Sequence, residues 1–94
     1  MGRYERREYH RTVVREMIGT EILRQDDRFG VQNHIFAGWM IILGEEFGEA
    51  AKAVNKYIFD GEPYDNIIEE LVHTAAVAIQ AAAAIRETGL RRHA

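Results

Sequence analysis

The sequence predicts an all-α protein with three main helices in an antiparallel bundle that is completed by homo-oligomerisation. Three observations predict this fold. Apolar side chains recur three and four residues apart in three segments, which is the period of a helix. Glycine and proline separate the segments, and the third is rich in alanine around most of its circumference. Because no linker or internal repeat divides the chain, we expect residues 1–94 to form a single helical domain.

Length and composition restrict the size of the core and the class of protein. The chain has 94 residues, 47% of them hydrophobic, with no cysteine and one proline. A domain of this size buries only roughly 60 to 65% of the surface that its unfolded chain exposes, so self-association is an expected source of further burial. The lack of cysteine is typical of a cytoplasmic protein without disulfides. We expect no membrane span and no secretory signal, because no run of 18 apolar residues is present.

The charge pattern restricts the class of partner. The formal net charge is −3, and the middle of the chain is acidic. The arginines lie mainly near the two ends, at Arg3, Arg6, Arg7, Arg11, Arg86, Arg91 and Arg92. This distribution fits solvated helix ends better than a nucleic-acid groove, so we expect neither nucleic acid nor membrane as a partner.

The first helix is predicted over residues 4 to 24. Its apolar positions, which keep the helical spacing, are Tyr9, Val13, Val14, Met17, Ile18, Ile22 and Leu23. Polar side chains interrupt this pattern over residues 25–30, and Gly30 suits a turn with positive φ. We therefore expect a loop after residue 24.

The second helix is predicted over residues 33 to 59, with Asn33 as a candidate N-cap. Gly38, Gly44 and Gly48 each lower its intrinsic stability by roughly 1 kcal/mol relative to alanine. Gly44 and Gly48 share one face. They allow either close approach of another helix or room for a ligand, and we favour helix packing.

The third helix is predicted over residues 63 to 88, since Gly61 and Pro63 are typical of a helix end followed by a new helix start. The short connection favours an antiparallel arrangement of the second and third helices. Alanine dominates residues 75–84, and an alanine surface on several sides requires several close neighbours. A second copy of the chain would supply them, which predicts a homodimer or homotetramer.

Acidic side chains border the apolar faces of the second and third helices. Glu46 and Glu49 lie about 60° apart on a helix, and Glu70 and His73 repeat the same spacing. Facing each other, the two pairs would form a polar pocket in a helical core. Like charges at this separation require neutralisation, and Mg²⁺ held through oxygen is the expected cation.

Two stretches carry a resemblance to a known family. Residues 39–53 read WMIILGEEFGEAAKA, and residues 69–78 read EELVHTAAVA. Together they resemble the MazG-type all-α nucleoside triphosphate pyrophosphohydrolase superfamily, whose motifs are Glu-Glu-x-x-Glu and then Glu-x-x-Asp on the following helix. Residues 28–34 (RFGVQNH) resemble the loop before the first motif helix in short, single-domain members, including phage-encoded ones. The resemblance spans residues 24–85, and His73 stands where the family pattern has Asp.

The resemblance implies a fold, an activity and a set of metal ligands. Members hydrolyse a nucleoside triphosphate to the monophosphate and pyrophosphate, with Mg²⁺ held by carboxylates of the two motif helices. Carried over to this sequence, Glu46, Glu49 and Glu70 are metal ligands. Glu45 either orients a metal-bound water or acts as the base.

The position of His73 leaves two arrangements open. An imidazole that ligates the metal would favour Mn²⁺ over Mg²⁺. We expect instead that His73 stays outside the ligand set, since Mg²⁺ sites are commonly completed by water and phosphate oxygens. A different class of function is the alternative: a helical dimerisation or regulatory module that keeps the fold with weakened or lost catalysis.

Four further residues are candidates for substrate binding. Lys52 could reach the triphosphate as a point charge, or pair with Glu49 on the surface. Gln32 and His34 could hydrogen-bond a base or phosphate from the loop before the second helix. Trp39 could stack on a base, although an aromatic residue at helical spacing is more often part of the core.

Overall fold

The computed structural model describes residues 1–89, and the regular secondary structure in this range is all α-helix. Three helices follow in order: α1 (Arg3–Phe29), α2 (Phe36–Asp60) and α3 (Asp65–Thr88). The predicted all-α class is confirmed. The predicted basic positions Arg91 and Arg92 lie outside the described residues.

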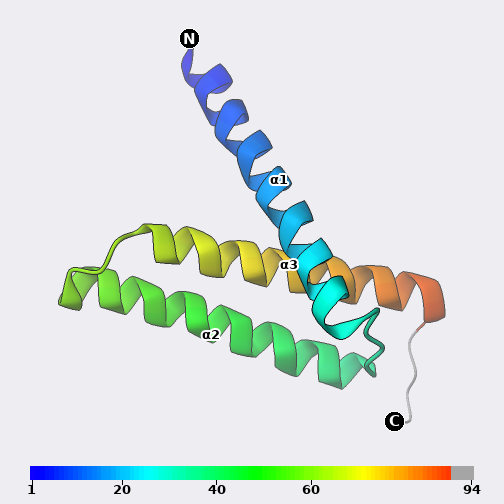
Figure 1. Cartoon of the computed structure of the whole chain (residues 1–94). Helices are drawn as coiled ribbons and strands as arrows, with labels where there is room; N and C mark the ends of the chain where they lie inside the picture. The colour runs from blue at the N-terminus through cyan, green and yellow to red at the C-terminus, as the bar shows by residue number, and fades with distance from the viewer. Residues whose placement is uncertain (90–94) are drawn as a thin grey trace.

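The central helix is α3, because it packs against both α2 and α1. Figure 1 shows α2 and α3 side by side, running in opposite directions and joined by a short connection. In the same view α1 crosses α3 with its C-terminal half, and its N-terminal half extends away from the α2–α3 hairpin. The α2–α3 hairpin and the crossing of α1 over α3 together position the residues of the candidate site.

The predicted loop over residues 25–29 is wrong, because α1 continues to Phe29. The polar residues there interrupt the apolar period without interrupting the helix. Gln25 is held by side-chain hydrogen bonds to α1 and α3, and the Gly30 N–H closes the last turn by donating to the Asp26 carbonyl at 2.8 Å. Gly30 has φ of 70°, so its predicted positive φ is confirmed.

The predicted starts of the second and third helices also shift. Asn33 is not the N-cap of α2, since the helix begins at Phe36 after Ile35 in an extended conformation. Asn33 lies in the connection after α1. Similarly α3 begins at Asp65, two residues after Pro63. The predicted helix end at Gly61 is confirmed, with φ 70° and ψ 19° in the left-handed region.

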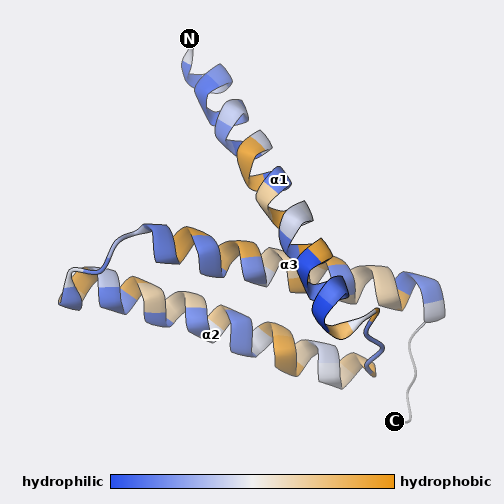
Figure 2. Cartoon of the chain, viewed as in Figure 1, coloured by the Kyte–Doolittle hydropathy of each residue, from blue (hydrophilic) through white to orange (hydrophobic). Residues whose placement is uncertain are grey.

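The core is small and lies between α2 and α3. Its centre is Trp39, Val77 and Ala81, flanked by the partly buried Ile42, Leu43 and Ala84. Many large apolar side chains outside this core are exposed, and Figure 2 shows apolar segments on all three helices. By length and composition alone α3 is apolar enough to cross a membrane. The central helix of a soluble protein passes the same test, so this is weak evidence for a membrane span.

The glycines of α2 do not serve helix packing within this chain. A Cβ built on Gly44 or Gly48 meets no atom within 4 Å. The favoured explanation, close approach of a neighbouring helix, is therefore not met by α1 or α3 over the described residues.

Candidate metal and nucleotide site

Two carboxylates and one imidazole meet between α2 and α3. Glu46 lies on α2, and Glu70 and His73 lie one turn apart on α3. One possible ligand atom from each residue lies within 4.8 Å of the other two. All three side chains are half-buried, so they border the core while remaining within reach of solvent. We call Glu46, Glu70 and His73 the acid–histidine cluster.

Small buried residues explain why these side chains meet. Glu46 lies one turn before Ala50 on α2, and His73 lies one turn before Ala76 on α3. Both alanines are buried, and their short side chains let the two helices approach closely. Because residues one turn apart share a helix face, the cluster faces the same seam as the alanines. The antiparallel hairpin therefore brings together acids that are distant in the sequence.

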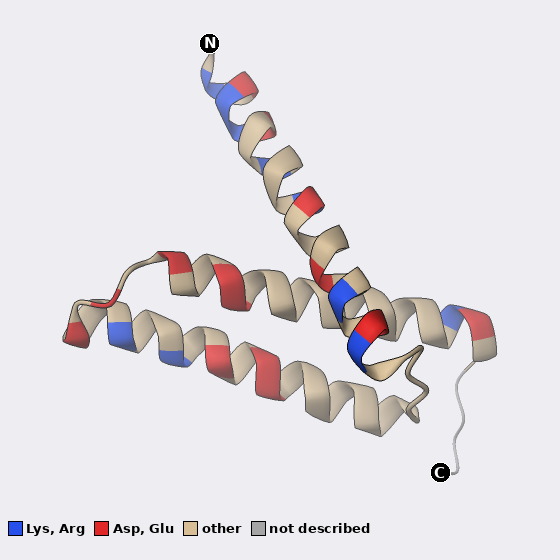
Figure 3. Ribbon diagram, in the orientation of Figure 1, with Lys and Arg blue, Asp and Glu red and all other residues tan. Residues whose placement is uncertain are grey.

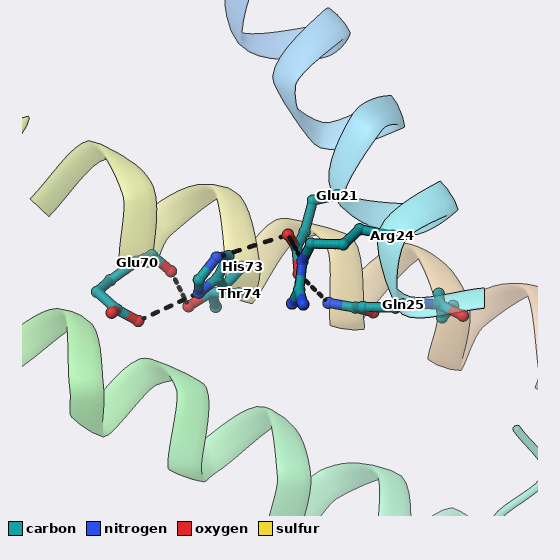
Figure 4. Close-up of polar contacts among 7 residues, drawn as sticks. Glu21, Arg24, Gln25, Glu70, His73 and Thr74 are labelled. Atoms are coloured by element: carbon teal, nitrogen blue, oxygen red, sulfur yellow. Dashed lines mark hydrogen bonds and ion pairs between the residues drawn. The ribbon is translucent and has the colours of Figure 1, made fainter. Parts of the chain in front are cut away.

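His73 lies between two carboxylates from different helices (Figure 4). Its Nδ1 is 3.5 Å from Glu70 Oε2, and its Nε2 is 3.6 Å from Glu21 Oε1 on α1. A metal-bound histidine commonly turns its second ring nitrogen toward a carboxylate, which fixes the ring orientation. His73 thus has one ring nitrogen beside Glu70 of the cluster and the other beside Glu21.

Glu21 is the one charged residue that is buried within residues 1–89, 7% exposed. Arg24 donates to both of its oxygens at 2.8 and 2.7 Å, and Gln25 Nε2 donates to Oε2 at 2.7 Å. The hydrogen bond from Arg24 holds the pKa of Glu21 below its usual range, against the opposing effect of burial. Glu21 is consequently an ionised acceptor at neutral pH, fixed on the side of His73 away from Glu70.

The role of Glu21 was not predicted from the sequence, although a signal is present. Glu21 follows Met17 by four residues and Ile18 by three, so it lies on the apolar stripe of α1. A carboxylate on such a stripe is buried only with partners. Two of its partners follow within the next turn, in residues 24 and 25.

The electrostatics of Glu46 favour a bound cation. Burial raises the pKa of Glu46 above its usual value, and the negative charges of Glu70, Glu21 and Glu49 raise it further, while His73 acts in the opposite direction. Desolvation and the neighbouring negative charges both disfavour the ionised form of Glu46, and either a bound proton or a bound cation would offset them. A divalent ion would do so while Glu46 stays ionised.

A cavity of about 280 Å³ adjoins the cluster. Side chains of all three helices line it, among them Gln25, Arg28, Trp39, Glu46, His73 and Gln80. Arg28 and the amides lie on α1 and α3, whereas Glu46 and His73 belong to the acid–histidine cluster. The cavity therefore joins the candidate metal ligands to a surface that carries amides and the Arg28 guanidinium.

The other predicted acids lie outside the cluster. Glu45 and Glu49 are exposed on α2, and only Glu46 of the first motif joins Glu70 and His73. Glu49 is nevertheless close enough for its charge to affect the pKa of Glu46. Lys52 is exposed, and residues 1–89 contain no ion pair between it and Glu49.

The predicted substrate-binding residues of the connection and of α2 are brought together. His34 Nε2 lies 2.9 Å from Gln32 Oε1, and the His34 ring packs edge-on against Trp39 with centroids 4.8 Å apart. Gln32 and Trp39 line the cavity. Trp39 is 3% exposed, so its interpretation as a core residue is confirmed, and its Nε1 has no hydrogen-bond partner.

Basic and acidic residues are concentrated in different parts of the structure (Figure 3). Basic residues dominate the start of α1, and acids gather on α2 and on the first half of α3. The acid–histidine cluster lies in this acidic region.

No model of a known protein family, no curated protein and no solved structure matches the chain.

Proposed function

We propose that the protein is a divalent-metal-dependent nucleoside triphosphate pyrophosphohydrolase, which converts a (d)NTP into the (d)NMP and pyrophosphate. The observation that supports this proposal is the acid–histidine cluster, with ligand atoms within 4.8 Å of one another at the edge of a cavity. Glu46 and Glu70 match the motifs from which the resemblance was drawn, and His73 stands where the family pattern has Asp.

The side chains present fit a hard or borderline divalent cation. Glu46 and Glu70 supply carboxylate oxygens, which Mg²⁺ and Mn²⁺ both accept, and His73 adds an imidazole nitrogen, which suits Mn²⁺ better. When bound, the cation would neutralise phosphate charge and lower the pKa of an attacking water. We propose Mg²⁺ as the cofactor, with Mn²⁺ as the alternative.

The chain's own groups would orient the substrate for attack at the α-phosphorus. Water adds its oxygen to this phosphorus, the bond from it to the α–β bridging oxygen breaks, and pyrophosphate leaves. By the resemblance, Glu45 is proposed to accept the water proton or to orient the water, although it is exposed on α2 and lies outside the cluster, and Glu49 is proposed as a further ligand. Arg28, which lines the cavity, and Lys52, which is exposed on α2, are the proposed groups that attract phosphate.

A catalytically weakened or inactive helical dimerisation or regulatory module is the second candidate. The observation that favours it is the Glu21 network, since Arg24 and Gln25 satisfy Glu21 without any ligand. In this alternative the cluster would be a structural ion network, and the exposed apolar surfaces would bind a second copy.

The discriminating experiment measures pyrophosphate release from a panel of standard and modified (d)NTPs, with Mg²⁺ and with Mn²⁺. Glu70→Gln serves as the cluster variant, and Glu87→Gln, an exposed acid at the end of α3, as the matched control. We expect release by the wild type and the control, and its loss in Glu70→Gln. No release from any nucleotide, together with no metal binding by calorimetry, would leave the structural module.

A further inference from the structure

Two glutamines from different helices meet in the cavity beside the acid–histidine cluster. Gln25 lies on α1 and Gln80 on α3, and both line the cavity. Gln80 Nε2 donates a hydrogen bond to Gln25 Oε1. Gln25 Nε2 in turn donates to Glu21 Oε2 at 2.7 Å. A continuous chain of side-chain hydrogen bonds therefore runs from a buried carboxylate to Gln80.

This chain fixes which way each amide points. An ionised carboxylate only accepts hydrogen bonds, so Gln25 must turn its NH₂ group toward Glu21 and its oxygen toward Gln80. Gln80 must then turn its NH₂ group toward Gln25. Gln80 Oε1 and the second N–H of Gln80 remain without a partner within residues 1–89. A side chain with one free acceptor and one free donor is thus held in a defined orientation at the cavity wall.

From this arrangement we infer that Gln80, oriented by Gln25 and Glu21, binds the base of the nucleotide and helps to determine base preference. The inference rests on the proposed function, because the cluster at the other side of the cavity would hold the phosphates. Every nucleobase presents neighbouring hydrogen-bond donors and acceptors along one edge, which an amide can match. Gln80 touches the base, whereas Gln25 and Glu21 are positioning residues.

The size of the cavity suits a base. Pockets for drug-sized ligands occupy about 300 to 1,000 Å³. At about 280 Å³ the cavity admits one flat ring system beside the cluster. The charge of Arg24 at this side is already matched by Glu21, and Arg28 is a further cation in the cavity lining. The Nε1 of Trp39, another lining residue, is buried and has no hydrogen-bond partner among the described residues.

The test combines binding with turnover. Nucleoside monophosphates with each of the standard bases are titrated into the full-length protein and followed by ¹H–¹⁵N NMR, and kcat/KM is measured for the matching triphosphates. Gln80→Met keeps the length of the side chain and removes both amide groups. Gln80→Glu keeps the shape and replaces the donor by an acceptor. Asn55→Met and Asn55→Asp, at an exposed amide of α2, are the matched controls.

We expect Gln80→Met to lower kcat/KM for the preferred base by about 10- to 100-fold and to flatten the order of preference, as loss of a paired base contact does. Gln80→Glu should lower it as well, because the new carboxylate cannot donate to Gln25 Oε1 and residue 80 loses its orientation. Mn²⁺ affinity, measured by electron paramagnetic resonance without nucleotide, should stay unchanged in Gln80→Met. The Asn55 controls should retain the wild-type order.

The outcomes separate this inference from the proposed function. Wild-type hydrolysis with an order of base preference that both Gln80 variants leave unchanged would overturn the inference alone. Absence of hydrolysis would overturn the proposed function, and the inference would then be decided by the monophosphate titrations. No binding of any monophosphate at millimolar concentration, or binding equal in wild type and Gln80→Glu, would overturn it. Thermal unfolding identifies a variant that fails to fold. In that case the comparison with the wild type is made with the other Gln80 variant.

Discussion

Glu46 is the residue at which charge repulsion and metal binding compete. Its raised pKa means that the ionised form is disfavoured in the folded protein, first by burial. We expect Glu46→Gln to abolish metal-dependent hydrolysis and to weaken metal binding by more than about 100-fold, since even residues that only support a ligand contribute 10- to 100-fold.

The same substitution should stabilise the metal-free protein at neutral pH. A carboxyl with a raised folded-state pKa favours folding fully only below its unfolded value of 4.5, and loses this contribution as pH rises through the folded-state pKa. The advantage of Glu46→Gln in urea denaturation should therefore be present at pH 7 and vanish below pH 4.5. If Glu46→Gln instead unfolds while activity per folded molecule survives, Glu46 is structural.

Under the proposed function, His73 is the residue expected to influence which metal the site prefers. Its Nδ1 lies 3.5 Å from Glu70, and replacing it by aspartate restores the residue of the family pattern. We expect His73→Asp to increase Mg²⁺ affinity and turnover with Mg²⁺ by about 10-fold or more and to reduce the preference for Mn²⁺, because oxygen suits Mg²⁺ better than nitrogen does. Calorimetry with both ions measures this shift. Unchanged affinity for both ions would place residue 73 outside the site.

Glu21 should contribute stability that depends on pH. Its pKa is lowered in the folded state, chiefly by the hydrogen bond from Arg24, so its contribution is present above the unfolded value of 4.5 and is lost as pH falls through the folded-state pKa. We expect Glu21→Gln to lower the free energy of unfolding at pH 7 by about 1 to 3 kcal/mol, the scale of hydrogen bonds to a charged group.

The measurement is urea denaturation of wild type and Glu21→Gln between pH 3 and pH 7. The difference between them should shrink below pH 4.5. Glu16→Gln, an exposed glutamate of α1, is the matched control and should follow the wild type. A difference that stays constant down to pH 3 would contradict the role given to the Glu21 charge.

At the scale of elements, apolar periodicity predicts the helices and misplaces their ends. The period of three and four identifies all three helices, because each presents an apolar side to a neighbour. The same rule ends α1 too early: residues 25–28 are polar, yet the helix continues to Phe29, and Gln25 is bonded across to Gln80 on α3. Such a contact depends on the crossing of α1 over α3, which no local pattern specifies.

The candidate site was also predicted only in part by local sequence pattern. The three-residue spacing of Glu70 and His73 and the position of Glu46 predict a shared pocket, and the structure brings these three together. Glu21 joins them from a segment about fifty positions away from His73, so its contribution follows only from the tertiary arrangement. The amides of Gln25 and Gln80 meet for the same reason.

Substitution of Gly48 distinguishes packing of α2 against helices of the same chain from packing against a second copy. A Cβ at this position meets no atom within 4 Å, so Gly48→Ala is accommodated in the isolated chain. We expect it to raise the free energy of unfolding by about 0.5 to 1 kcal/mol, the helix-propensity difference between glycine and alanine. Urea denaturation at low protein concentration measures the effect. Gly30→Ala, at φ 70°, should destabilise and provides the contrast.

The opposite result for Gly48→Ala would be equally informative. A loss of stability that grows with protein concentration would mean that the methyl group obstructs an interface with a second copy. Gly48 would then serve the close helix approach that the sequence suggested, in the assembly and not in the chain.

At the scale of the whole molecule, residues 1–89 are extended and expose many large apolar side chains. The radius of gyration is 15.6 Å, against about 13 Å for a compact domain of 100 residues. The N-terminal half of α1 projects from the hairpin with few neighbours (Figure 1). Large apolar side chains are exposed along one heptad-spaced row of α2, at Met40, Phe47 and Val54.

This exposed row predicts self-association, the homodimer or homotetramer that would complete the bundle. Phe47 is 65% exposed, and burying such an aromatic side chain contributes about 1.5 to 3 kcal/mol per protomer. We expect sedimentation at micromolar concentration to give a dimer or tetramer for the wild type and for Asn55→Glu, an exposed polar position of α2. Phe47→Glu should shift the equilibrium toward monomer by about 100-fold or more, because a charge in a buried interface is disfavoured. A wild-type monomer at these concentrations would exclude the assembly and leave the three helices as they are.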